Sequence, residues 1–165
     1  MNRKLFDYIA ASPSPYHAVA HSAETLRAAG FLPLSEGEDW DLTPGQGYYV
    51  TRNGSSLIAF RAKRDFSGFL MTASHCDSPT FKIKENAELT GSGYRRLAVE
   101  KYGGMLMSTW MDRPLGIAGR VLLRKGSGIE SRLLDLGGAC AVIPNVAIHM
   151  NRKANDGYAW NPAVD

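Results

Sequence analysis

The sequence predicts an α/β protein in two parts, a first part with helices and strands and a mostly β second part. Residues 1–30 carry apolar side chains at helical spacing, and residues 47–74 contain β-rich runs around a turn dipeptide. Beyond Pro79, short strand-like runs alternate with glycine-rich turns. We therefore expect one domain over residues 1–82 and a β-rich domain over residues 83–165.

Two helices are expected near the N-terminus. The first has an apolar face and ends at the proline-rich SPSP run; its apolar residues are Leu5, Phe6 and Ile9. The second has Ser14 as its predicted N-cap, Pro15 at its first position and Gly30 as its stop signal. Together these signals predict two successive helices that precede the strands.

The strands of the first part are predicted by turn chemistry and by continuous hydrophobicity. Asn53-Gly54 separates two β-rich runs and predicts a hairpin. The run GFLMTAS, residues 68–74, is almost continuously apolar, which is typical of a strand that is buried on both faces. This predicted strand ends at His75, the first residue of chemical interest.

The second part is predicted to be a small barrel or sandwich. Its strand-like runs are FKIK, RRLAVEKYGG, MLMSTWM, IAGRVLLRK and IESRLLDLG. The GSG at residues 126–128 predicts a tight connection between the last two runs. The final residues, NDGYAWNPAVD, show no closing helix or strand, which favours an interrupted domain.

Composition excludes several classes of function. The hydrophobic content of 44% and the charged content of 21% are those of a globular protein. A net charge of +3, with basic residues never more than two in a row, argues against a nucleic-acid partner. No apolar run is long enough for a signal peptide or a membrane span. The two cysteines, Cys76 and Cys140, form no C-x-x-C pair and are expected to be reduced thiols of a cytoplasmic protein.

His75 and Asp77 lie two residues apart after the predicted buried strand, at the edge where α/β proteins place their active sites. A carboxylate that accepts one ring N–H fixes the tautomer of a histidine and makes the other nitrogen a better zinc ligand. The spacing alone is weak evidence. Two interpretations therefore stay open, a metal ligand with its orienting carboxylate, or an ordinary polar strand end.

The other candidates favour structural roles. His149 is most simply a partly buried histidine at the end of a strand or helix, and Asp112-Arg113 a turn with a surface ion pair. Cys76 is poorly placed to be activated by His75, because neighbouring residues of a strand point to opposite faces. A cysteine hydrolase is therefore disfavoured.

Five motifs in order resemble the M18 family of metalloaminopeptidases, the aspartyl aminopeptidases. They are SPSPYHAV, ASHCDSPTFKIK, VEKYGG, STWMDRPLGIAGRV and IPNVAIHMNR, and they extend over most of the chain. The resemblance implies the N-terminal part of an α/β zinc-peptidase domain at residues 1–82. It implies a mostly β dimerisation domain, inserted into it, from residue 83 onward.

The resemblance also implies roles for three residues. His75 would be a zinc ligand, Asp77 the carboxylate that orients it, and His149 a substrate-binding residue that reaches a neighbouring subunit's active site. The family uses two zinc ions, removes N-terminal, preferably acidic, residues from peptides, and assembles from dimers into a dodecamer. The segment that reads IPHLAIH in the family type reads IPNVAIH here.

Only one zinc ligand of the family is matched, whereas a catalytic zinc site needs at least three protein ligands. We therefore expect an N-terminal portion of an aminopeptidase that is catalytically incomplete by itself. The alternative is a non-catalytic oligomerisation or interaction module, in which the β-rich part self-associates through its apolar strands.

Overall fold

The computed structural model describes residues 2–65, 67–91 and 93–157. The chain divides into two compact units. The first unit comprises Met1–Asp77 and Ala118–Leu136, and the second comprises Ser78–Ile117 and Gly137–Asp165. The boundaries of these units differ from those of the predicted domains 1–82 and 83–165, because one hairpin from the second half of the chain belongs to the first unit. The functional division into two domains stays a prediction.

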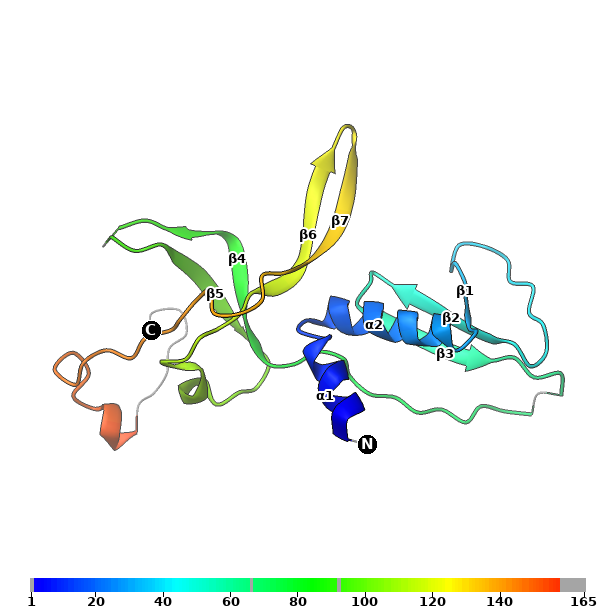
Figure 1. Ribbon diagram of the computed structural model, residues 1–165, viewed down its shortest axis with the longest axis horizontal. Coiled ribbons are helices and arrows are strands. Elements are labelled where there is room, and N and C mark those ends of the chain that lie inside the picture. The colour runs from blue at the N-terminus through cyan, green and yellow to red at the C-terminus, as the bar shows by residue number, and fades with distance from the viewer. Residues whose placement is uncertain (1, 66, 92, 158–165) are drawn as a thin grey trace. The chain divides into compact units, whose positions relative to one another are not determined.

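In its described residues, the first unit contains two helices and five strands (Figure 1). They are α1 (Asn2–Ala10), α2 (Pro15–Ala28), β1 (Leu32–Pro33), β2 (Gly47–Arg52), β3 (Ser56–Arg61), β6 (Ala118–Lys125) and β7 (Gly128–Asp135). The sheet has the order β1-β2-β3, with β1 parallel and β3 antiparallel to β2. Strands β6 and β7 pair with each other in an antiparallel hairpin.

The predicted helix and turn signals are confirmed. The side chain of Ser14 accepts a hydrogen bond from the backbone N–H of His17, and Pro15 opens α2. Gly30 follows α2 with a φ of +81°, a conformation that glycine adopts without steric cost. Asn53 and Gly54 both have positive φ and connect β2 to β3.

The core of the first unit lies between α2 and β2. Its buried side chains are Ala18, Val19, Ala23, Tyr48, Tyr49 and Val50. The hydroxyl of Tyr49 accepts a hydrogen bond of 2.9 Å from the Arg27 guanidinium of α2. The ring of Tyr48 packs against Phe60, its partner across the hairpin, and its hydroxyl accepts from the Thr43 N–H. Both faces of β2 are therefore covered, whereas the apolar face of α1 is exposed.

The predicted buried strand over residues 68–74 is wrong. The segment has no regular secondary structure, and Phe69, Leu70 and Met71 are 77%, 102% and 81% exposed. None of the strand pairings in the described part of the chain includes it. A strand is stabilised by neighbours that satisfy its backbone groups and cover its side chains, so hydrophobicity alone does not produce one.

As far as it is described, the second unit contains the hairpin of β4 (Thr80–Leu89) and β5 (Arg96–Tyr102) and two short 3₁₀-helices, Met107–Trp110 and Ala154–Asp156. The run MLMSTWM, predicted as a strand, instead includes the first of these helices. Trp110 packs edge-on against Phe81 of β4, with 5.4 Å between the ring centroids. The predicted ending beyond residue 157 lies outside the described residues.

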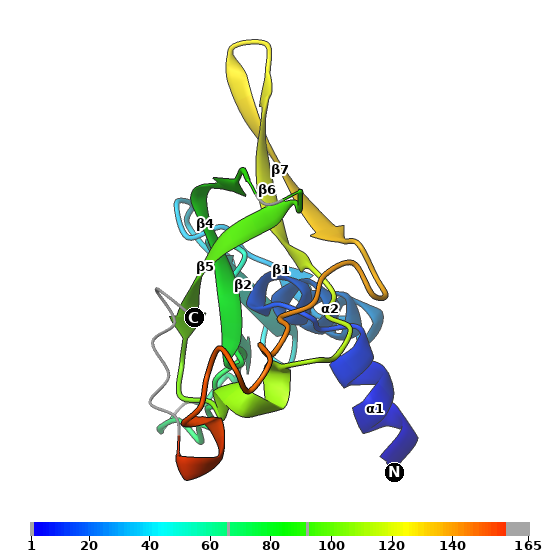
Figure 2. The ribbon, with the colours of Figure 1, turned by 90° about the vertical axis from the view of Figure 1, so that its left-hand side faces the viewer.

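The predicted barrel or sandwich is also wrong for the residues that the structure describes. The second half contributes two separate two-stranded sheets, β4-β5 and β6-β7. The GSG turn is confirmed, because Lys125 pairs with Gly128 and Gly126 has a φ of +60°. Figure 2 shows β6 and β7 as a two-stranded ribbon. Across the described ranges, no helix is long and apolar enough to cross a membrane.

One arginine anchors the β6–β7 hairpin within the first unit. The Arg120 guanidinium lies 4.2 Å from the ring centroid of Tyr16 in α2. It also donates to the backbone oxygen of Asn53 at 2.7 Å and to the Asn53 side-chain oxygen at 3.0 Å. Because an isolated two-stranded hairpin is marginally stable, these contacts stabilise its position on α2.

Replacing Arg120 with alanine is expected to destabilise the first unit by about 1–2 kcal/mol, since a cation–π contact and two hydrogen bonds are lost. Urea unfolding measures the change. Arg120→Lys keeps the charge but lacks the planar fork, so an intermediate loss is expected. A lysine variant as stable as the parent chain would contradict the role given to the fork.

Candidate metal-ligand site

His75 and Asp77 contact each other as the sequence spacing suggested. The Nδ1 atom of His75 lies 2.9 Å from the backbone oxygen of Asp77 and 3.1 Å from its Oδ1. The His75 side chain is 82% exposed and that of Asp77 39% exposed. The pair therefore lies on an irregular, accessible segment instead of at the end of a buried strand.

The two partners determine the tautomer of the neutral His75 ring. A backbone carbonyl and a carboxylate can only accept hydrogen bonds, so Nδ1 must carry the proton. The free lone pair is then on Nε2, the atom that is available to a metal ion. This arrangement of carboxylate and histidine is the one that holds many zinc-ligating rings in place.

Cys76 does not join this pair. Its Sγ lies 3.4 Å from the backbone oxygen of Ser55, in the loop between β2 and β3. Both Cys76 and Cys140 are exposed free cysteines. The contact with Ser55 does not activate a nucleophile, and the cysteine-hydrolase alternative gains no support from it.

A zinc ion fits His75 as one ligand, but the described residues do not complete a site. Among residues 2–65, 67–91 and 93–157, no group of three histidine, cysteine, aspartate or glutamate side chains could hold a metal ion. A catalytic zinc site requires at least three protein ligands. The described residues therefore offer one histidine in contact with a carboxylate, and no second or third candidate ligand beside it.

His149, the predicted substrate-binding residue, belongs to the second unit. It is exposed, in a turn where the N–H of Met150 donates to the oxygen of Ala147 at 2.8 Å. The predicted partial burial of this histidine at a strand or helix end is wrong. An exposed imidazole in a turn is available for contact with another molecule.

Sequence reasoning missed the contact between Asp112 and Asn145, which precedes His149. Asn145 donates its backbone N–H to Asp112 Oδ1 at 2.8 Å and its side-chain Nδ2 to Oδ2 at 2.7 Å. The expected ion pair of Asp112 with Arg113 is not formed, and Arg113 donates to the Thr109 carbonyl. The side-chain and backbone hydrogen bonds from Asn145 lower the pKa of the Asp112 carboxyl.

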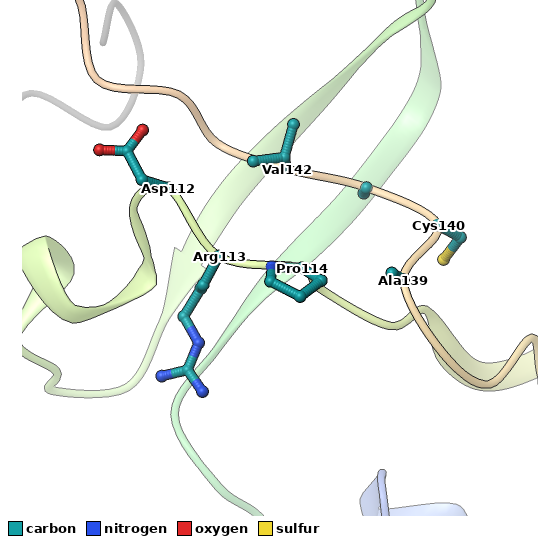
Figure 3. Close-up of a pocket in the computed structure, with 7 residues that line it drawn as sticks. Asp112, Arg113, Pro114, Ala139, Cys140 and Val142 are labelled. Atoms are coloured by element: carbon teal, nitrogen blue, oxygen red, sulfur yellow. The ribbon is translucent and has the colours of Figure 1, made fainter.

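Asp112 also lines a shallow cavity of about 440 Å³ (Figure 3). The cavity lies between two chain segments, and its lining residues are Asp112, Arg113, Pro114, Ala139, Cys140, Ala141 and Val142. The only available sequence signal for the missed contact was the Asp-Arg-Pro turn, because aspartate in turns often accepts backbone N–H groups. Its partner, 33 residues away, had no signal.

Comparison with known proteins places these residues in a family of hydrolases. Residues 8–165 match the model of the family described as aminopeptidase I zinc metalloprotease (M18). A probable M18 family aminopeptidase 2 of Pseudomonas paraeruginosa is 48% identical over 164 residues, covering 98% of this chain and 38% of the relative. The chain therefore belongs to the M18 family of aminopeptidases.

Solved structures share the fold. The structure of an Ape4 and Nbr1 complex matches with a TM-score of 0.89 and 40% identity, over 96% of this chain and 31% of that one. The S. cerevisiae mApe1 dodecamer matches with a TM-score of 0.77 and 34% identity, over 89% of this chain and 36% of that one. The chain thus spans well under half the length of these relatives.

Proposed function

We propose that this chain contributes part of the zinc site of an M18 aminopeptidase that removes N-terminal, preferably acidic, residues from peptides. The observation that carries the proposal is the His75–Asp77 contact, which leaves Nε2 free to bind a metal ion. The family description as a zinc metalloprotease supports the choice of metal. Asp77 acts by orienting His75, and His149 contacts the peptide.

The chain's own residues perform only part of the reaction. His75 would hold the ion through Nε2 while Asp77 keeps the proton on Nδ1, and the exposed His149 would bind the substrate. When bound, zinc supplies Lewis-acid activation of the scissile peptide carbonyl. With one ligand in the described residues, the chain alone is catalytically incomplete. We place its activity in the cytoplasm.

In the proposed arrangement, residues 1–82 belong to a catalytic domain, and residues 83–165 begin an inserted dimerisation domain. The structural similarity to an mApe1 dodecamer supports assembly into a homo-oligomer, which we propose is built from dimers. His149 would then reach the active site of a neighbouring subunit. The complete enzyme would bind two zinc ions.

Zinc titration of the 165-residue chain, followed through the NMR signals of the histidine rings, tests this proposal. Zinc is expected to shift the His75 signals, and His75→Ala should abolish the binding that they report. His149→Ala, which removes another exposed histidine, should leave the response of His75 unchanged. A His75 ring that does not respond to zinc would overturn the ligand assignment.

The same chain, supplied with zinc and a peptide that begins with aspartate or glutamate, is expected to show no turnover. One ligand cannot build the site that the hydrolysis requires. Release of the N-terminal amino acid is measured directly. Sustained release that disappears in His75→Ala would contradict the proposed incompleteness.

A second candidate is a non-catalytic module that self-associates. It is favoured by the apolar side chains that β6 and β7 expose, including Leu122 and Ile129, which are 61% and 75% exposed. Light scattering after size exclusion tests it, because a module of this kind should form dimers or larger species. A strict monomer at high protein concentration would count against it.

A further inference from the structure

Two segments of the second unit are joined side by side just before the turn that contains His149. The N–H of Leu115 donates to the backbone oxygen of Ala141 at 2.9 Å, and the N–H of Cys140 donates to the backbone oxygen of Leu115 at 3.0 Å. Nearer to His149, the N–H of Asp112 donates to the oxygen of Ile143 at 2.9 Å. The last contact between the two segments is made by the side chain of Asp112.

In that contact, the Asp112 carboxylate accepts the two hydrogen bonds from Asn145. Asp112 has a backbone φ of +53°, a conformation that residues other than glycine rarely adopt. Such a conformation persists only where surrounding contacts maintain it. Three hydrogen bonds between Asp112 and the facing segment provide those contacts, and together we call them the Asp112 clamp.

The clamp ends four residues before His149. Between them the chain passes directly into the turn in which the N–H groups of Met150 and Asn151 both approach the oxygen of Ala147. The residues from Asn145 to Met150 are exposed, so apolar burial contributes little to their order. Where burial is slight, local hydrogen bonds largely determine how a segment is held.

We propose that Asp112 is a positioning residue for His149: its carboxylate fixes Asn145 and so sets the orientation of the turn that presents the imidazole. This inference rests on the proposed function for the substrate-binding role of His149.

Amide hydrogen exchange on the full chain tests the clamp without zinc or peptide. Asp112→Ala should accelerate exchange of the Asn145 amide about tenfold and reduce the order parameters of Ala147 and His149, because the charge-assisted bonds are lost. Asp112→Asn keeps an acceptor for the backbone N–H of Asn145 and should give a smaller change. The urea midpoint and the exchange of β4 and β5 should stay unchanged.

The matched control is Glu130→Gln, which removes another carboxylate that side chains hydrogen-bond, in β7 of the first unit. It should not alter exchange at Asn145 or motion at His149. A positioning role is overturned if Asp112→Ala leaves both unchanged, or accelerates exchange equally throughout the second unit, as a merely structural role would. Because no metal or substrate is used, this result is independent of the zinc and peptidase tests.

Discussion

Replacing Tyr49 with alanine is expected to lower the free energy of unfolding of the first unit by about 3–5 kcal/mol, as for other large aromatic side chains removed from a core. Tyr49 is 3% exposed, and its hydroxyl binds Arg27 of α2. The core that it shares is small, with six buried apolar residues described. A loss of this size is a large share of the stability of an ordinary domain.

Tyr49→Phe separates packing from hydrogen bonding. Phenylalanine keeps the ring but leaves the Arg27 guanidinium without its partner, so a loss of about 1 kcal/mol is expected. Urea unfolding followed by circular dichroism measures both variants. Equal losses for alanine and phenylalanine would show that the hydroxyl, and not the packing of β2 on α2, carries the stabilisation.

Local signals predicted the elements that depend on local chemistry. Ser14 and Pro15 act within one helical turn, and Asn53-Gly54 and Gly126 satisfy turns that need positive φ. These features depend on backbone geometry over a few residues. They are therefore readable from sequence without knowledge of the rest of the fold.

Predictions that depended on distant partners failed or were missed. The run at residues 68–74 has the hydrophobicity of a buried strand, but burial requires neighbours that the sequence pattern does not identify. The contacts of Arg120 with Tyr16 and of Asp112 with Asn145 join residues far apart in the chain. No periodicity or spacing rule signals such pairs.

In the candidate site, too, the contact between near neighbours was predictable from the sequence, whereas the contact between distant residues was not. The contact of His75 with Asp77 was predictable, because the two residues are separated by only one position and an imidazole can reach a carboxylate that close in the chain. The contact of Asn145 with Asp112 was not predictable, since the two residues lie 33 positions apart in the chain. The role assigned to each histidine came from the motifs and stays a prediction.

Asp77→Asn is expected to weaken zinc binding at His75 about 10–100-fold, the usual cost of removing a carboxylate that orients a ligating histidine. The carboxylate accepts the hydrogen bond from Nδ1, so the lone pair stays on Nε2, the atom that would bind the ion. Asparagine is neutral, and its amide can turn a donor toward the ring, which favours the wrong tautomer. The backbone oxygen of Asp77 still accepts from Nδ1, so the ring should remain partly oriented and binding should not vanish.

A zinc titration that monitors the His75 ring signals measures this effect, with Asp65→Asn as the control. Asp65 belongs to the same unit, and its replacement changes the net charge by the same amount without touching the histidine. If both variants weaken zinc binding equally, the effect is long-range charge and Asp77 does not position the ligand. A selective loss in Asp77→Asn, with binding abolished only in His75→Ala, is the result that the geometry predicts.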